Sequence, residues 1–173
     1  MRYLWAPWRM EYILEGKQKG CIFCKKPREK KDKENLILYQ NEYALVMMNK
    51  FPYNNGHVMV VPKHHGPDLN QLGDKEFQEL IYLLKATIQI LKTILHPHGF
   101  NIGMNIGKIG GAGVEDHVHF HIVPRWTGDT NFMPILGKTK IVPEYLEKTY
   151  DQLHPAFADL KRRKRGRKGG RKK

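Results

Sequence analysis

The sequence has no long apolar run, only two cysteines and no leader-like start. Its apolar runs are far shorter than the roughly 20 residues of a membrane span, so we exclude a membrane-spanning protein. Met1–Glu15 lacks the basic, apolar and small-residue order of a secretory signal, and residues 1–20 are interpreted as an aromatic N-terminal arm. We expect a cytoplasmic protein with no membrane partner, whose 173 residues form one domain with its own core.

Acidic residues are absent from Lys161–Lys173, where ten lysines and arginines carry most of the net charge of +13. That segment also has no apolar residue to bury, and we predict a disordered basic tail over residues 158–173. Two interpretations stay open: a solvated tail without a specific partner, or electrostatic attachment to nucleic acid or another polyanion. The rest of the chain is not broadly basic.

Hydrophobic periodicity predicts an α+β domain built on an antiparallel β-sheet. One long helix is predicted from Lys75 to about His96, because its apolar residues recur at helical spacing and Pro97 follows. A shorter C-terminal helix is predicted near residues 144–153. Alternating or short apolar runs predict strands at residues 36–39, 43–48, 57–62, 101–107 and 117–122. Strands grouped around one good helix are typical of the α+β class.

Three histidines alternate with apolar residues in the segment His117–Ile122. Side chains two apart on a strand share a face, so the three imidazoles are expected on one open surface, with the apolar residues toward a core. Imidazole serves as nucleophile, acid or base, and metal ligand near neutral pH. The preceding loop, Gly107–Gly113, can turn backbone N–H groups toward an anion. Together these features predict a phosphate beside a nucleophilic imidazole.

The run His117–Val123 resembles the signature of the histidine triad (HIT) family of nucleotide hydrolases and transferases. Further segments resemble the family in the same order: Met48–Pro52, Gly56–Lys63 and Asn105–Gly107. Leu4–Arg9 and Pro124–Pro134 resemble the bacterial branch of diadenosine tetraphosphate phosphorylases, also called ATP adenylyltransferases. The resemblance implies a HIT-like fold over residues 21–157 and a homodimer.

The same resemblance implies cleavage of diadenosine polyphosphates through a nucleotidyl group on His119, with His117 and His121 completing the catalytic set. Phosphate as acceptor would give ADP and ATP, and water would give AMP and ATP; the sequence leaves this open. Nucleotide contacts are implied for Asn49, Asn105, Gly111, Gly113 and His121. The alternatives are a nucleoside phosphoramidase, a hydrolase that removes AMP from nucleic-acid ends, and a nucleotide- or RNA-binding protein.

Cys21 and Cys24 form a Cys-x-x-Cys pair, which in a cytosolic chain indicates a metal site or a redox pair. The polar, lysine-rich sequence after it lacks the helix start of a thioredoxin-like pair. Zinc needs four ligands. HIT relatives with this knuckle imply that His65 and His117 complete the set, with the neighbouring His64 as an alternative to His65. Four protein ligands would close the coordination sphere and make the zinc structural.

Overall fold

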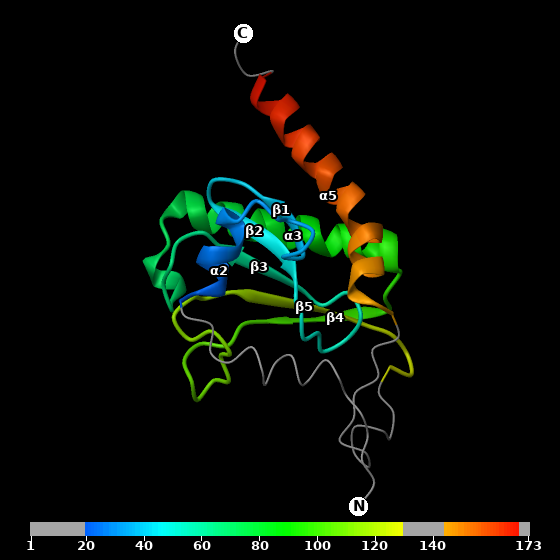
Figure 1. Ribbon diagram of the computed structural model, residues 1–173, viewed down its shortest axis with the longest axis horizontal. Coiled ribbons are helices and arrows are strands. Elements are labelled where there is room, and N and C mark those ends of the chain that lie inside the picture. Colours follow the sequence, from blue (N-terminus) through cyan, green and yellow to red (C-terminus); the bar gives the residue numbers. More distant parts are fainter. Residues whose placement is uncertain (1–19, 130–143, 170–173) are drawn as a thin grey trace, which may run out of the picture.

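The computed structural model describes residues 20–129 and 144–169, with side chains up to Arg162. Its elements follow the order α2 (Ile22–Lys25), η1 (Lys26–Arg28), β1 (Ile37–Gln40), β2 (Ala44–Met48), β3 (Val58–Pro62), η2 (Leu69–Gln71), α3 (Asp74–Leu95), β4 (Gly99–Gly103), β5 (Phe120–Arg125) and α5 (Leu146–Gly169). The five strands form one antiparallel sheet in the order β1-β2-β3-β5-β4 (Figure 1). The predicted α+β class with an antiparallel sheet is confirmed.

The two faces of the sheet are covered by different segments. Helices α3 and α5 pack on one face and bury the larger core, which includes Leu83 of α3 and Phe157 of α5 (Figure 1). The opposite face carries a smaller core in which Phe23 of α2 packs against Leu45 and Met59. Met59 lies opposite His121 in the β3–β5 register, so His121 lies on the face that α2 covers.

Two predicted strands are displaced in the structure. The strand expected at residues 101–107 is β4, Gly99–Gly103, and the chain leaves the sheet after Gly103 pairs with His121. The strand expected at 117–122 begins only at Phe120 and continues to Arg125. The residues before Phe120 hydrogen-bond to the segment after β3 instead, since the Val118 N–H donates to the Gly66 carbonyl at 2.8 Å.

The long helix matches its prediction within one residue, but the C-terminal helix is longer than expected. Helix α3 ends where His96 adopts a left-handed conformation, with φ of 48°. Helix α5 has 24 residues, against 22 in α3, and continues into the segment predicted to be a disordered tail. Buried Leu153 and Phe157 anchor its first half. Lysine and arginine have good helix propensity, so the helix can continue beyond the packed part.

The predicted aromatic arm, residues 1–20, lies outside the described residues except for Gly20. Within the described ranges, no helix has the length and apolar character needed to cross a membrane.

Candidate active site and metal site

Two of the three histidines are covered, so the expectation of an open imidazole face is wrong for them, whereas His121 is half-buried. His117 is fully buried and His119 is 4% exposed. The Phe23 ring covers both, with ring centroids 5.3 Å from His117 and 4.7 Å from His119. Sequence reasoning placed the cysteine knuckle beside the histidines but missed Phe23, which stands between the two cysteines and brings an apolar ring onto the triad.

Backbone carbonyls fix opposite ring nitrogens of His117 and His119. His117 Nε2 lies 2.8 Å from the Pro62 carbonyl oxygen, so this nitrogen carries the hydrogen and Nδ1 keeps a lone pair. His119 Nδ1 lies 2.9 Å from the His117 carbonyl oxygen, so its hydrogen is on Nδ1 and its lone pair on Nε2. The two rings therefore offer different nitrogens for chemistry.

A fourth histidine, His57, determines which ring nitrogen of His121 carries the hydrogen. The Tyr53 N–H donates to His57 Nδ1 at 3.0 Å, which leaves the hydrogen of His57 on Nε2. His57 Nε2 lies 2.9 Å from His121 Nδ1, so His57 donates and His121 accepts. The hydrogen of His121 is then on Nε2, where it can be donated to an anion. Sequence reasoning had placed His57 at the start of an apolar strand, and only the β3–β5 pairing reveals its partner.

Burial keeps the triad neutral. Burial lowers the pKa values of His117 and His119 below the ordinary value for histidine. Burial, with a smaller contribution from His119, lowers the pKa of His121 to about 4. Near neutral pH, His119 is thus an unprotonated imidazole, which is the nucleophilic form.

The four residues predicted as metal ligands come together, and His64 is not among them. One ligand atom each from Cys21, Cys24, His65 and His117 lies within 4.8 Å of the others. His65 Nδ1 and His117 Nδ1 are 3.3 Å apart, and three nitrogen–sulfur distances are 3.3, 3.5 and 3.6 Å. His64 Nδ1 instead lies 4.0 Å from a carboxylate oxygen of Glu76.

These distances fit a tetrahedral ion. Zinc–nitrogen bonds of about 2.0–2.1 Å and zinc–sulfur bonds of about 2.3 Å give tetrahedral edges near 3.3 Å between nitrogens and about 3.6 Å between nitrogen and sulfur. Burial and the neighbouring Cys21 raise the pKa of the Cys24 thiol, so a thiolate here calls for a bound cation. The hydrogen bond from His117 Nε2 to Pro62 also leaves Nδ1 as the coordinating nitrogen, and such support is typical of metal-bound histidine.

The predicted nucleotide-binding amides brace the loops beside the triad. Asn49 Oδ1 accepts the Phe51 N–H at 2.9 Å, and its Nδ2 lies 3.4 Å from His57 Nδ1. Asn105 Nδ2 donates to the Gly111 carbonyl at 3.2 Å, which folds the glycine-rich loop back on itself. Gly111 has a φ of +84°, a conformation that favours glycine, and a Cβ at Gly113 would meet nothing within 4 Å.

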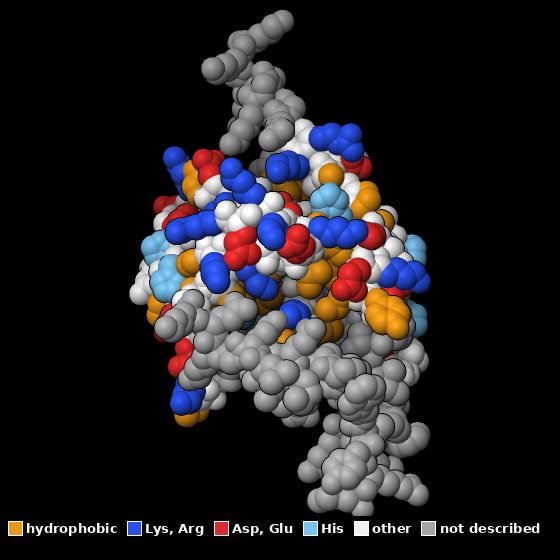
Figure 2. Space-filling view, viewed as in Figure 1, with side chains coloured by type: hydrophobic (Ala, Val, Ile, Leu, Met, Phe, Trp, Pro, Cys, Tyr) orange, Lys and Arg blue, Asp and Glu red, His pale blue; other side chains and the backbone are white. Residues whose placement is uncertain are grey.

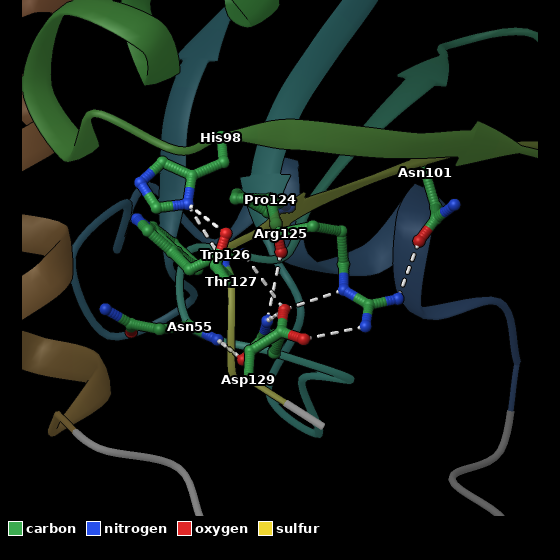
Figure 3. Close-up of polar contacts among 9 residues, drawn as sticks. Asn55, His98, Asn101, Pro124, Arg125, Trp126, Thr127 and Asp129 are labelled. Carbon is green, nitrogen blue, oxygen red and sulfur yellow. Dashed lines mark hydrogen bonds and ion pairs between the residues drawn. The ribbon is translucent and has the colours of Figure 1, made fainter. Parts of the chain in front are cut away.

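A clamp at the end of β5 holds the next loop in place (Figure 3). The Arg125 guanidinium makes two bonds to Asp129, at 2.7 and 2.8 Å, and a third to Asn101 Oδ1 at 2.8 Å. Asn54 donates to the Asp129 carboxylate at 2.7 Å and to the Pro124 carbonyl at 3.1 Å. The clamp therefore ties the loop that carries Tyr53 to the strand that carries His121.

Both the sequence and the fold of the chain are similar to those of known proteins. The HIT domain matches residues 30–128. An AP-4-A phosphorylase of Mycobacterium tuberculosis is 36% identical over 158 residues, covering 86% of this chain and 80% of the relative. An adenosine 5'-monophosphoramidase of Schizosaccharomyces pombe is 34% identical over 106 residues, covering 61% of this chain and 74% of the relative. A zinc-bound histidine triad family protein of Mycobacterium smegmatis has a TM-score of 0.65 and 27% identity, covering 82% of this chain and 96% of that one.

Proposed function

Because the chain belongs to the HIT family, we propose that it cleaves diadenosine polyphosphates through a covalent nucleotidyl intermediate on His119. The observation that carries the proposal is the buried, neutral His119 ring, whose Nδ1–H is held by the His117 carbonyl so that Nε2 keeps its lone pair. The similarity to the mycobacterial phosphorylase supports this substrate, because it extends well beyond the HIT domain at residues 30–128. The phosphoramidase similarity spans a smaller share of the chain.

In the first step, His119 Nε2 attacks the α-phosphorus of the dinucleotide. A nitrogen–phosphorus bond forms and the bond to the bridging oxygen breaks, so that diadenosine tetraphosphate would leave ATP and an adenylyl group on His119. The imidazole becomes positively charged, and its Nδ1–H strengthens its bond to the His117 carbonyl. His121 donates its Nε2–H to a phosphate oxygen, because His57 occupies its other nitrogen.

In the second step, an oxygen nucleophile attacks the same phosphorus and His119 leaves as a neutral imidazole. Inorganic phosphate as the nucleophile yields ADP, and water yields AMP and releases one proton to solvent. We favour phosphate because of the similarity to the phosphorylase. Burial under Phe23 supports the return of His119 to its neutral form, since an imidazolium is less stable in an apolar site.

We infer that the cluster of two cysteines and two histidines holds a structural zinc ion. Its donor atoms and spacings suit a closed tetrahedral site, and the M. smegmatis protein of similar fold is zinc-bound. With four protein ligands no position is left for substrate. When bound, the ion would join Cys21 and Cys24 of the N-terminal segment to His117, whose carbonyl orients His119.

We further propose a cytoplasmic homodimer. Supporting the dimer, Ile102 on edge strand β4 and Phe77 and Ile81 on α3 are each at least 40% exposed, so they offer apolar surface that a second copy could cover. Light scattering of the purified protein distinguishes dimer from monomer.

Product analysis tests the proposed function. The enzyme is incubated with diadenosine tetraphosphate, with and without inorganic phosphate, and the nucleotides formed are identified. We expect phosphate-dependent ADP and ATP from the wild type, and a loss of about 10³-fold or more in His119→Asn. The matched control is His96→Asn, an exposed histidine whose left-handed conformation asparagine tolerates. Equal activity in all three proteins would place the chemistry outside the triad. Preferential cleavage of adenosine 5'-phosphoramidate would favour the phosphoramidase alternative.

A further inference from the structure

Helix α5 leaves the body of the protein after its packed half. Tyr150, Leu153 and Phe157 are buried and Leu160 is half-buried, whereas Lys161 and Arg162 are exposed. The helix nevertheless continues to Gly169, and Figure 1 shows its end projecting beyond the sheet and α3. Nine helical residues from position 161 extend about 13 Å at the usual rise of about 1.5 Å per residue.

The segment Lys161–Lys173, which the structure describes up to Gly169, is called the basic arm below, and its charge is unbalanced. It has ten lysines and arginines and no acidic residue, and the last acidic residue of the chain, Asp159, is paired with Arg162. On the body, by contrast, lysines and arginines are interspersed with acidic side chains (Figure 2).

The base of the arm lies near another cation, Lys63, which directly follows β3. Burial lowers the pKa of Lys63, the nearby carboxylate of Asp32 raises it, and the like charge of Lys161 makes a smaller contribution that lowers it. Within the arm itself the cations have no acidic neighbour in the sequence, so they repel one another, and a bound polyanion relieves that repulsion.

We propose that the basic arm binds the phosphate backbone of nucleic acid without reading its sequence. Backbone phosphates repeat about every 3.4 Å along a strand, so 13 Å of helix matches roughly four of them. Contacts between phosphates and lysine or arginine carry no sequence information. A membrane surface fits less well, because the arm has no apolar residue to insert between lipids.

The packed half of α5, from which the arm starts, and the candidate active site lie on opposite faces of the sheet. Leu153 and Phe157 of α5 belong to the core shared with α3, whereas Phe23 and the triad lie on the other face. The arm therefore tethers the protein to nucleic acid and does not deliver a nucleic-acid end to His119. This inference goes beyond the proposed function, and nucleotide cleavage is expected to be independent of it.

Fluorescence anisotropy tests the arm. The full chain is titrated into labelled duplex DNA, duplex RNA and single-stranded RNA over a range of salt concentrations. The arm variant replaces three cations with glutamine, which keeps good helix propensity: Arg163, Arg165 and Lys168. A control variant removes the same charge from exposed positions of α3 by the same replacement: Lys75, Lys85 and Lys92.

We expect the arm variant to lose at least tenfold in affinity near 0.1 M salt, with its slope of log affinity against log salt lowered by about 2–3. In the control variant, the affinity and the salt slope should change by much less. The arm variant and the control variant should both cleave dinucleotide at the wild-type rate. Equal losses in the two variants would overturn the proposal, because only net charge would matter. Binding to anionic vesicles that duplex DNA fails to displace would also overturn it, in favour of a membrane.

Discussion

Acidification should destabilise the folded protein through His121, and the size of the effect follows from the structure. His121 Nδ1 accepts a hydrogen bond from His57 Nε2 at 2.9 Å. Protonating His121 would place a hydrogen on Nδ1, facing the hydrogen that His57 already donates. Burial of the ring, with a smaller contribution from His119, lowers the pKa of His121 to about 4, and this hydrogen-bond geometry also opposes protonation.

The unfolded chain binds this proton first, because the ordinary pKa of histidine is about 6.5. Above that pH both states are neutral at His121 and the residue contributes no pH dependence. As the pH falls from about 6.5 to about 4, stability decreases by up to about 1.4 kcal/mol per pH unit, and the loss levels off once the folded state is also protonated. Allowing for the partial exposure of His121, the total loss is about 2–3 kcal/mol.

Urea unfolding of the wild type and His121→Gln, at several pH values between about 7 and 4.5, isolates this contribution. Glutamine can still accept the His57 N–H through its side-chain oxygen but does not titrate. The metal cluster and all carboxylates are common to both proteins, so their pH dependence cancels in the difference. We expect the wild type to lose its stability relative to the variant as the pH falls. Parallel curves would refute a half-buried, neutral His121 that donates from Nε2.

Substitutions at two positions of the N-terminal segment test the metal cluster and the cover over the triad. Cys21→Ser removes one of the four donors. We expect metal analysis to find less than one zinc ion per chain of this variant, and its Tm to be lower than that of the wild type. A wild type that holds no zinc and has the same Tm as the variant would argue against the site. Phe23→Ala should cost about 3–5 kcal/mol in urea unfolding, because the ring is 2% exposed, and Phe23→Leu should cost much less. If both Phe23 variants were as stable as wild type, Phe23 would not pack over His119 as described.

The fold could be predicted from local patterns because its elements obey simple periods. The helix predicted over residues 75–96 has an apolar stripe, and α3 follows it within one residue. Strand limits were less predictable because they depend on pairing: the sheet continues to Arg125 only because β4 pairs with β5 up to Gly99. The length of α5 was underestimated, since its basic half shows no amphipathic pattern and continues a helix that Phe157 anchors.

The site was predictable where the sequence brings its residues close together, and less so where the tertiary fold does. Alternation alone singled out His117, His119 and His121. The covering ring of Phe23 and the donor His57 come from other segments, and no local pattern connects them with the triad. The same reason explains why an open imidazole face was expected: periodicity states which side chains share a face, but not what packs against it.

One short segment thus gives three identical side chains three different hydrogen-bonded states, which backbone carbonyls set for His117 and His119 and the His57 side chain sets for His121. His117 is held at Nε2 by Pro62 and presents Nδ1 to the cysteines. His119 is held at Nδ1 by the His117 carbonyl, and His121 accepts at Nδ1 from His57. Because His117 serves both the metal cluster and the carbonyl that orients His119, any change in the cluster that moves its backbone also moves the nucleophile. The structural ion that we propose at this position would therefore support catalysis through geometry and without touching the substrate.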